Sequence, residues 1–123
     1  PSVRTMQPDR LSLAPRAPAF ETTSQKYVVS DGTRSLEIYT VQGLGHSQGM
    51  LVAYLPKEKM LVNADLYSPP AQGAQPPTTP TVGSVVLNQN IQRLKLDVAQ
   101  HVPIHGRVGT MEEFTKIVGA PRN

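Results

Sequence analysis

Three residues whose side chains could bind a metal stand beside apolar stretches of this sequence. His46 lies in the glycine-rich stretch GLGHSQGM just before one apolar run, Asp65 ends a second run, and His105 follows the short run HVPI. Imidazole and carboxylate groups together suit zinc or iron. Functional sites often lie in loops at strand ends, and glycines beside both histidines would let the backbone bend sharply or approach a ligand. His46, Asp65 and His105 are therefore the candidate metal ligands.

Each candidate also has an interpretation without function. A histidine in a loop is more often a surface or hydrogen-bonded residue than a ligand, and Asp65 could simply end a strand, although an unpaired carboxylate is costly to bury. His101 and His105 have the H-x3-H spacing, but Pro103 favours an extended chain between them. In a strand, four residues span about 13 Å, which is too far for two imidazoles to share an ion with bonds of about 2 Å. His101 is thus excluded from the site.

Composition limits the class of protein. The chain has 123 residues, of which 38% are hydrophobic, enough for one domain with a modest core. The formal net charge of +3 comes from scattered basic residues, so nucleic-acid binding is not expected. No apolar run approaches the roughly 20 residues of a membrane span, so no membrane partner is expected either. With no cysteine the chain has no disulfide or thiolate metal site, and its compartment is left open.

Hydrophobic periodicity predicts strands first and helices later. Asp31-Gly32 stands between two β-rich runs, which is a strong signal for a hairpin. Residues 68–82 form a long proline- and glycine-rich loop, which is either functional or disordered. The expected order is β-β-β-β-α-β-α, with strands at 26–30, 33–42, 50–56, 60–66 and 101–104 and helices at 84–98 and 110–118.

Capping signals fix the expected helix ends. Ser84 is a plausible N-cap for the first helix. Thr110 and Glu113 form a capping box for the second helix, and Gly119 is a suitable stop. One apolar stripe is expected along the first helix, formed by Leu87, Ile91, Leu94 and Val98. Residues 1–25 show little periodicity and are expected to be an irregular lead-in to a domain at 26–123.

Two segments resemble the metallo-β-lactamase superfamily. GLGHSQGMLVAYLPKEKMLVNADLYSPP is similar to the part where a glycine-flanked histidine leads into a strand, a turn and a second strand ending in Asp. NIQRLKLDVAQHVPIHGRV is similar to the helix and strand that precede the superfamily's final His-Gly. The resemblance covers about residues 26–119. It implies an α/β (α+β) fold with one mainly antiparallel or mixed sheet and helices on one face, which is half of an αβ/βα sandwich.

The resemblance also implies roles for the candidates. His46 would bind the first metal, Asp65 would bridge two metals, and His105 would complete the second. The metal in this superfamily is usually zinc and sometimes iron or manganese, and a metal-bound hydroxide attacks an ester, thioester, amide or phosphoester. The function expected of a longer parent is that of a metal-dependent hydrolase, and its small-molecule substrate is not predicted.

One departure changes what we expect of this chain alone. The superfamily's His-x-His-x-Asp-His segment is absent, because no histidine precedes His46. The chain begins at Pro1, which we interpret as processing or as a piece of something longer. We therefore expect no catalytic residue, weak or absent metal binding and no hydrolase turnover. The alternative is a non-catalytic interaction or assembly module that retains the scaffold.

The missing half has a consequence for partners. Strands normally covered on both faces would leave one apolar face open, and burial of apolar surface contributes roughly 25 cal/mol per Å². The expected partner is a second copy, in a homo-oligomer that packs sheet on sheet, most simply a two-fold dimer. The alternative is that residues 1–25 fold back over this face.

Overall fold

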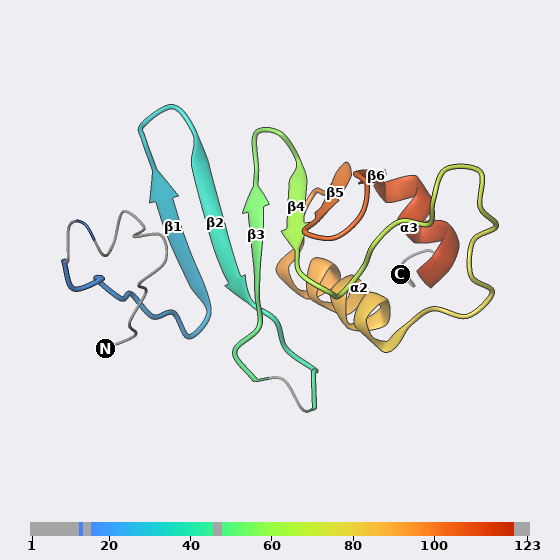
Figure 1. Cartoon of the computed structure of the whole chain (residues 1–123), viewed down its shortest axis with the longest axis horizontal. Coiled ribbons are helices and arrows are strands. Elements are labelled where there is room, and N and C mark those ends of the chain that lie inside the picture. The colour runs from blue at the N-terminus through green and yellow to red at the C-terminus, as the bar shows by residue number, and fades with distance from the viewer. Residues whose placement is uncertain (1–12, 14–15, 46–47, 120–123) are drawn as a thin grey trace.

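The computed structural model describes residues 13, 16–45 and 48–119, which form one six-stranded mixed sheet and two helices (Figure 1). The strands lie in the sheet in chain order, and all neighbours are antiparallel except β4 and β5, which are parallel and are connected through α2. This confirms the predicted fold class. The elements are β1 (Lys26–Ser30), β2 (Ser35–Thr40), β3 (Leu51–Leu55), β4 (Met60–Asn63), α2 (Val82–Leu94), β5 (Gln100–Pro103), β6 (Gly109–Thr110) and α3 (Met111–Val118).

The first two strands form the predicted hairpin. Residues 16–25 of the expected lead-in contain no helix or strand. In the turn, Oδ1 of Asp31 accepts hydrogen bonds from the backbone N–H groups of Thr33 (2.8 Å) and Arg34 (2.7 Å). Gly32 has a φ of 89°, a conformation that glycine adopts without a steric penalty. The hairpin projects from the end of the sheet that lies away from the helices (Figure 1).

The predicted position of α2 was wrong by a few residues at each end. Thr81, not Ser84, is its N-cap, and the Thr81 side chain accepts a hydrogen bond from the N–H of Ser84, which lies in the first turn. The helix ends where Lys95 adopts a left-handed conformation with φ 53°, before Val98 of the predicted stripe. Val98 is nevertheless buried, because the chain continues over the core as it approaches β5. Neither helix of the described part is long and apolar enough to cross a membrane.

The second helix, α3, begins with the predicted capping box. The Thr110 side chain accepts from the N–H of Glu113, and the Glu113 carboxylate accepts from the N–H of Thr110. Gly119 is the C-cap, as predicted. The expected element order missed β6, because this two-residue strand exists only through its pairing with β5.

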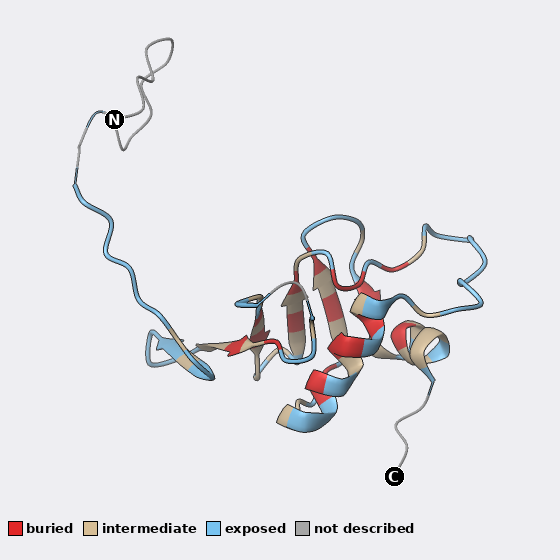
Figure 2. Ribbon diagram, turned by 90° about the horizontal axis from the view of Figure 1, so that it is seen from below, coloured by how far each residue is buried: buried red, intermediate tan, exposed pale blue. Residues whose placement is uncertain are grey.

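One face of the sheet packs against the helices and forms the core. Figure 2 shows buried positions repeating along the strands and along the side of α2 that faces them. Tyr54 also donates a hydrogen bond from Oη to the carbonyl of Asp97 (2.8 Å), which ties β3 to the chain after α2. The buried residues on β3, β4 and β5 are Val52, Tyr54, Leu61, Asn63, His101 and Pro103, and the helices contribute Ser84, Val86, Leu87, Asn90, Ile91 and Phe114.

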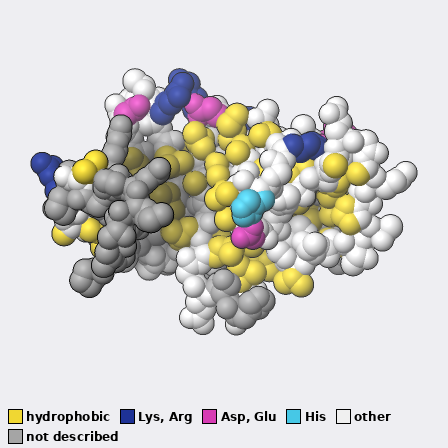
Figure 3. Space-filling model, in the orientation of Figure 1, with side chains coloured by type: hydrophobic (Ala, Val, Ile, Leu, Met, Phe, Trp, Pro, Cys, Tyr) yellow, Lys and Arg dark blue, Asp and Glu magenta, His cyan; other side chains and the backbone are white. Residues whose placement is uncertain are grey.

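The other face of the sheet, called the open face below, carries the residues that alternate with the buried ones. Tyr27, Ile38, Ala53, Val62 and Val102 form one row of cross-strand partners over β1–β5. None of these five residues is buried. Figure 3 shows hydrophobic side chains gathered on this face, with an acidic side chain and a His beside them near the centre of the view. Among the described residues, β3 is therefore apolar on both faces, and helices cover only one face of the sheet.

Candidate functional site

The parallel arrangement of β4 and β5 places the ends of both strands at one edge of the sheet. Asn63 and Pro103, the last residues of the two strands, are register partners. The N–H of Ile104 donates to the carbonyl of Asn63 (3.0 Å), which extends the ladder by one bond. The residues that follow the two strands, including Asp65 and His105, therefore leave the sheet side by side.

A buried asparagine shapes the turn that carries Asp65. Oδ1 of Asn63 accepts a hydrogen bond from the backbone N–H of Tyr67 (2.9 Å), which closes the turn after β4. Within this turn Asp65 has a φ of 61°, in the left-handed region that Asp tolerates better than most side chains. The closed turn holds the Asp65 side chain outside the core, where 68% of its surface is exposed.

The imidazole of His105 reaches the carboxylate of Asp65. Nδ1 of His105 lies 2.9 Å from Oδ1 of Asp65, and the His105 side chain is 75% exposed. Ser68 joins the two turns a second time, because its Oγ donates to the carbonyl of His105 (2.6 Å). Gly106 has a φ of 109°, and a Cβ there would lie 3.5 Å from the Ser68 side chain. An exposed imidazole and carboxylate are thus fixed together on two connected turns.

Chemically, the pair offers one nitrogen and up to two oxygen donors. Since Nδ1 of His105 is engaged by Asp65, Nε2 remains without a hydrogen bond among the described residues. A histidine that bonds a carboxylate through one nitrogen while binding a metal through the other is a common arrangement. With the hydrogen bond broken, both side chains could instead bind one ion. The pair therefore fits part of a zinc or iron site.

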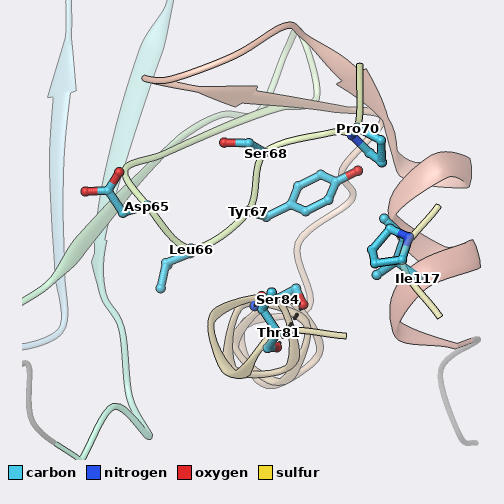
Figure 4. A pocket seen from close by; sticks show the side chains of 9 residues that line it. Asp65, Leu66, Tyr67, Ser68, Pro70, Thr81, Ser84 and Ile117 are labelled. Atoms are coloured by element: carbon cyan, nitrogen blue, oxygen red, sulfur yellow. Dashed lines mark hydrogen bonds between the residues drawn. The ribbon is translucent and has the colours of Figure 1, made fainter. Parts of the chain in front are cut away.

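A cavity of about 420 Å³ lies behind the turn, between the chain after β4 and the two helices. Figure 4 shows Tyr67, Thr81 and Ile117 around it, whereas the Asp65 carboxylate points away from them. Burial raises the pKa of the Tyr67 hydroxyl, which has no hydrogen-bond partner among the described residues. Of the two candidate ligands, Asp65 is among the residues that line this cavity and His105 is not.

An ion pair holds the start of the proline-rich loop near the site. Nε of Arg107 donates to the carbonyl of Pro70 (2.7 Å), and Nη2 of Arg107 contacts Oε1 of Glu113 (2.5 Å). Hydrogen bonds from Arg107 and from the backbone of Thr110 lower the pKa of Glu113 to about 2. Glu113 therefore links α3 to the residue that anchors the loop.

The outcomes differ among the histidines. Asp65 and His105 are brought together, while the third candidate, His46, lies outside the described residues. His101 belongs to the core: its side chain is fully buried, Nε2 lies 3.4 Å from Sδ of Met111, and its ring lies 4.3 Å from that of Phe114. Burial lowers the pKa of His101 to about 4. Pro103 lies in an extended strand, as the argument that excluded His101 required.

Metal binding itself remains a prediction. Among the described residues, no group of three or more His, Cys, Asp or Glu side chains could hold an ion. Sequence reasoning also missed Asn63 and Ser68, which position the pair through hydrogen bonds. A small polar residue at the end of an apolar run was the only signal for Asn63, and Ser68 gave none.

Comparison with known proteins supports the fold and not the chemistry. No protein-family model matches the chain, and no curated protein sequence does. Solved structures do match, each over 88% of this chain: a metallo-beta-lactamase from Pontibacter korlensis (21% identity, TM-score 0.56), TMB-1 (20%, 0.55) and the DIM-1 metallo-beta-lactamase exposed to ceftazidime (20%, 0.53).

The match covers only part of those proteins. The chain spans 51%, 50% and 51% of the three solved chains, so it is about half their length. At this level of identity the likeness concerns the fold alone. The described residues form one mixed sheet with two helices on one face, which agrees with a match to about half of each solved chain. The chain therefore has the metallo-β-lactamase fold, over about half of a complete metallo-β-lactamase domain.

Proposed function

We propose that this chain is half of a metal-dependent hydrolase domain, in which Asp65 and His105 supply part of the metal site. The observation that supports this is the 2.9 Å contact between the two side chains, both exposed at the edge where β4 and β5 end. Two of the three similar solved structures are described as metallo-beta-lactamases, which makes a metal the natural ligand to test.

The donors would have complementary roles. His105 would bind through an imidazole nitrogen, and the Asp65 carboxylate would bind directly or bridge two ions, while Asn63 and Ser68 keep both turns in place. Zinc would be the usual metal, with iron or manganese as alternatives, and it would supply Lewis acidity that lowers the pKa of a bound water. His46 is the third proposed donor.

Two donors make an incomplete site. A catalytic zinc generally has three protein ligands and a water, so the described pair needs further ligands. We propose that the isolated chain binds zinc weakly or not at all and does not turn over substrates. The complete domain would hydrolyse a small molecule at an ester, thioester or amide bond, and the geometry selects none of these.

A zinc titration followed by NMR and calorimetry tests the proposal. The imidazole signals of His105 should shift with zinc while those of fully buried His101 stay fixed, which gives a reference within the same sample. Asp65→Ala should abolish the response. Asp97→Ala is the matched control, because Asp97 is also highly exposed, at 73%, and lies in an ion pair with Lys59. An unchanged His105 signal would mean that this chain alone binds no zinc, and the assignment would be refuted if the signal also stays unchanged in a polypeptide that includes the other half of the domain.

Affinity tests the claim of incompleteness separately. Sub-micromolar zinc binding by a monomer would mean that this chain alone holds a complete site. Hydrolysis of an ester or β-lactam probe by this chain, lost in both Asp65→Ala and His105→Ala, would also mean that this chain alone holds a complete site.

The alternative is a non-catalytic assembly module on the same scaffold, and the open face of the sheet favours it. If a polypeptide that includes this chain shows no metal-dependent hydrolysis, the assembly role is preferred. Activity in that polypeptide, lost with Asp65→Ala, favours the hydrolase.

A further inference from the structure

The open face of the sheet has the composition of an interior. On β1–β5 it carries Thr40 and Gln100 as its only polar residues and no charged residue at all. Its central row, from Tyr27 to Val102, is apolar throughout. Soluble monomers rarely expose a contiguous apolar surface of this kind unless it binds something.

The contrast between the two faces is sharpest on β3 and β4. Along β3 the side chains of Val52 and Tyr54 are buried, whereas Leu51 on the open face is 45% exposed. Along β4, Leu61 is fully buried and its neighbour Val62 is not. Both sets are apolar, so the difference in exposure comes from the helices that cover only one face.

We propose that the open face binds a second copy of this chain, sheet against sheet, about a two-fold axis. The absence of charge disfavours a nucleic acid or a charged peptide, because either would need opposite charges on the surface that binds it. A twisted sheet packs well on another sheet about 10 Å away. The similar solved chains are about twice as long as this one. In the 123-residue chain on its own, a second copy would therefore take the place of the half of the domain that this chain does not span. This proposal does not rest on metal binding.

The size of the face predicts a weak dimer. Five strands spaced about 4.8 Å apart and about five residues long at about 3.3 Å each give a face of about 24 by 17 Å, or on the order of 400 Å². Two copies would bury on the order of 800 Å², below the roughly 1,600 Å² of a standard interface. We therefore expect a micromolar dissociation constant and exchange between monomer and dimer.

Sedimentation velocity of the full 123-residue chain tests the proposal. Between about 2 µM and about 200 µM, which brackets a micromolar affinity, the mean sedimentation coefficient should rise from the monomer value to the dimer value. Ala53→Lys places a charge in the central row of the open face, between Ile38 and Val62, and should weaken association at least tenfold. Val28→Lys is the matched control, because Val28 is 47% exposed on the other side of the β1–β2 hairpin.

A second variant guards against misfolding. If the amide NMR signals of Ala53→Lys lose the dispersion of the folded chain, Leu51→Lys is used in place of that variant. Leu51 is already 45% exposed on the open face, so a lysine there disturbs the fold less. A wild-type monomer at every concentration, without binding of a dye specific for apolar surface, would overturn the proposal and favour a cover made by this chain itself. A folded open-face variant that associates as the wild type does, or an equal loss in Val28→Lys, would also overturn it.

Discussion

The imidazole of His105 and the carboxylate of Asp65 are hydrogen-bonded at 2.9 Å, although forty residues separate them in the chain. The contact arises because β4 and β5 are parallel and end in register at Asn63 and Pro103. Most of the intervening chain is the proline-rich loop and α2, which form the crossover that a parallel pair requires. The geometry of the pair therefore depends on the backbone of the two turns as much as on the two side chains.

Two substitutions of Asp65 should distinguish the effect of its left-handed backbone from the effect of its carboxylate. Asp65→Ala places a Cβ-bearing residue without a helpful polar group at φ 61°, whereas Asp65→Gly relieves the strain. After allowing for the greater entropy of unfolded glycine, we expect the glycine variant to be more stable by about 0.5–1 kcal/mol. Urea denaturation measures the difference.

Both variants should lose the response of His105 to zinc, because both lack the carboxylate. Equal stability of the two variants would show that the turn relaxes away from its left-handed conformation when the side chain is removed.

Gly83 sets how closely α2 approaches the turn that carries Asp65. A Cβ at Gly83 would lie 2.6 Å from the carbonyl oxygen of Leu66, which is a backbone atom and cannot rotate away. Gly83→Ala should therefore destabilise the fold by about 1–3 kcal/mol and displace the turn. Denaturation and the amide shifts of residues 64–68 report the two effects. Gly45→Ala is the control, since an added Cβ there meets no atom within 4 Å, and it should leave residues 64–68 unchanged.

The capping box of α3 should contribute measurably to stability. Thr110→Ala removes the acceptor for the N–H of Glu113 and should destabilise the chain by about 1 kcal/mol. Thr110→Ser keeps an acceptor oxygen and should recover most of the loss. If the serine variant is as unstable as the alanine variant, the threonine methyl group matters more than the hydrogen bond.

How far the sequence predicted these features depends on how local each one is. The Asp31-Gly32 hairpin and the Thr110–Glu113 box were predicted because the residues that form them are neighbours in the chain. The start of α2 was misplaced because Thr81 and Ser84 are both good capping residues, and only the structure shows which of them accepts the bond. The strand β6 was missed because Gly109–Thr110 is extended only through its partner β5.

The candidate site follows the same rule. Alternation of apolar runs and glycines was enough to place Asp65 and His105 near strand ends, and the resemblance to a known fold brought the strands together. The predicted strand 60–66 was too long, because β4 ends at Asn63 and the left-handed Asp65 lies in the turn that follows. The hydrogen bonds from Ser68 to His105 and from Tyr67 to Asn63 join residues whose proximity no local pattern records.

The buried histidine should make the fold sensitive to mild acid. Burial lowers the pKa of His101 from 6.5 to about 4, so only the unfolded chain takes up its proton between these values. Above pH 6.5 the residue is neutral in both states and has no effect. As pH falls from 7 to 5, proton uptake by the unfolded state should reduce the free energy of unfolding by about 2 kcal/mol. The pKa of Glu113 is lowered from 4.5 to about 2 in the folded chain, so the stability that its carboxylate contributes is lost only as the pH falls below about 4.5.

Urea denaturation at pH 7, 6 and 5 measures this effect, and His101→Leu should remove the dependence. The imidazole has a ring contact with Tyr67 as well as with Phe114, so leucine will also lower the stability at every pH. The decisive quantity is therefore the slope against pH rather than the value at one pH. A slope that survives in His101→Leu would assign the acid sensitivity to another group and would place the proton on His101 in the folded chain as well.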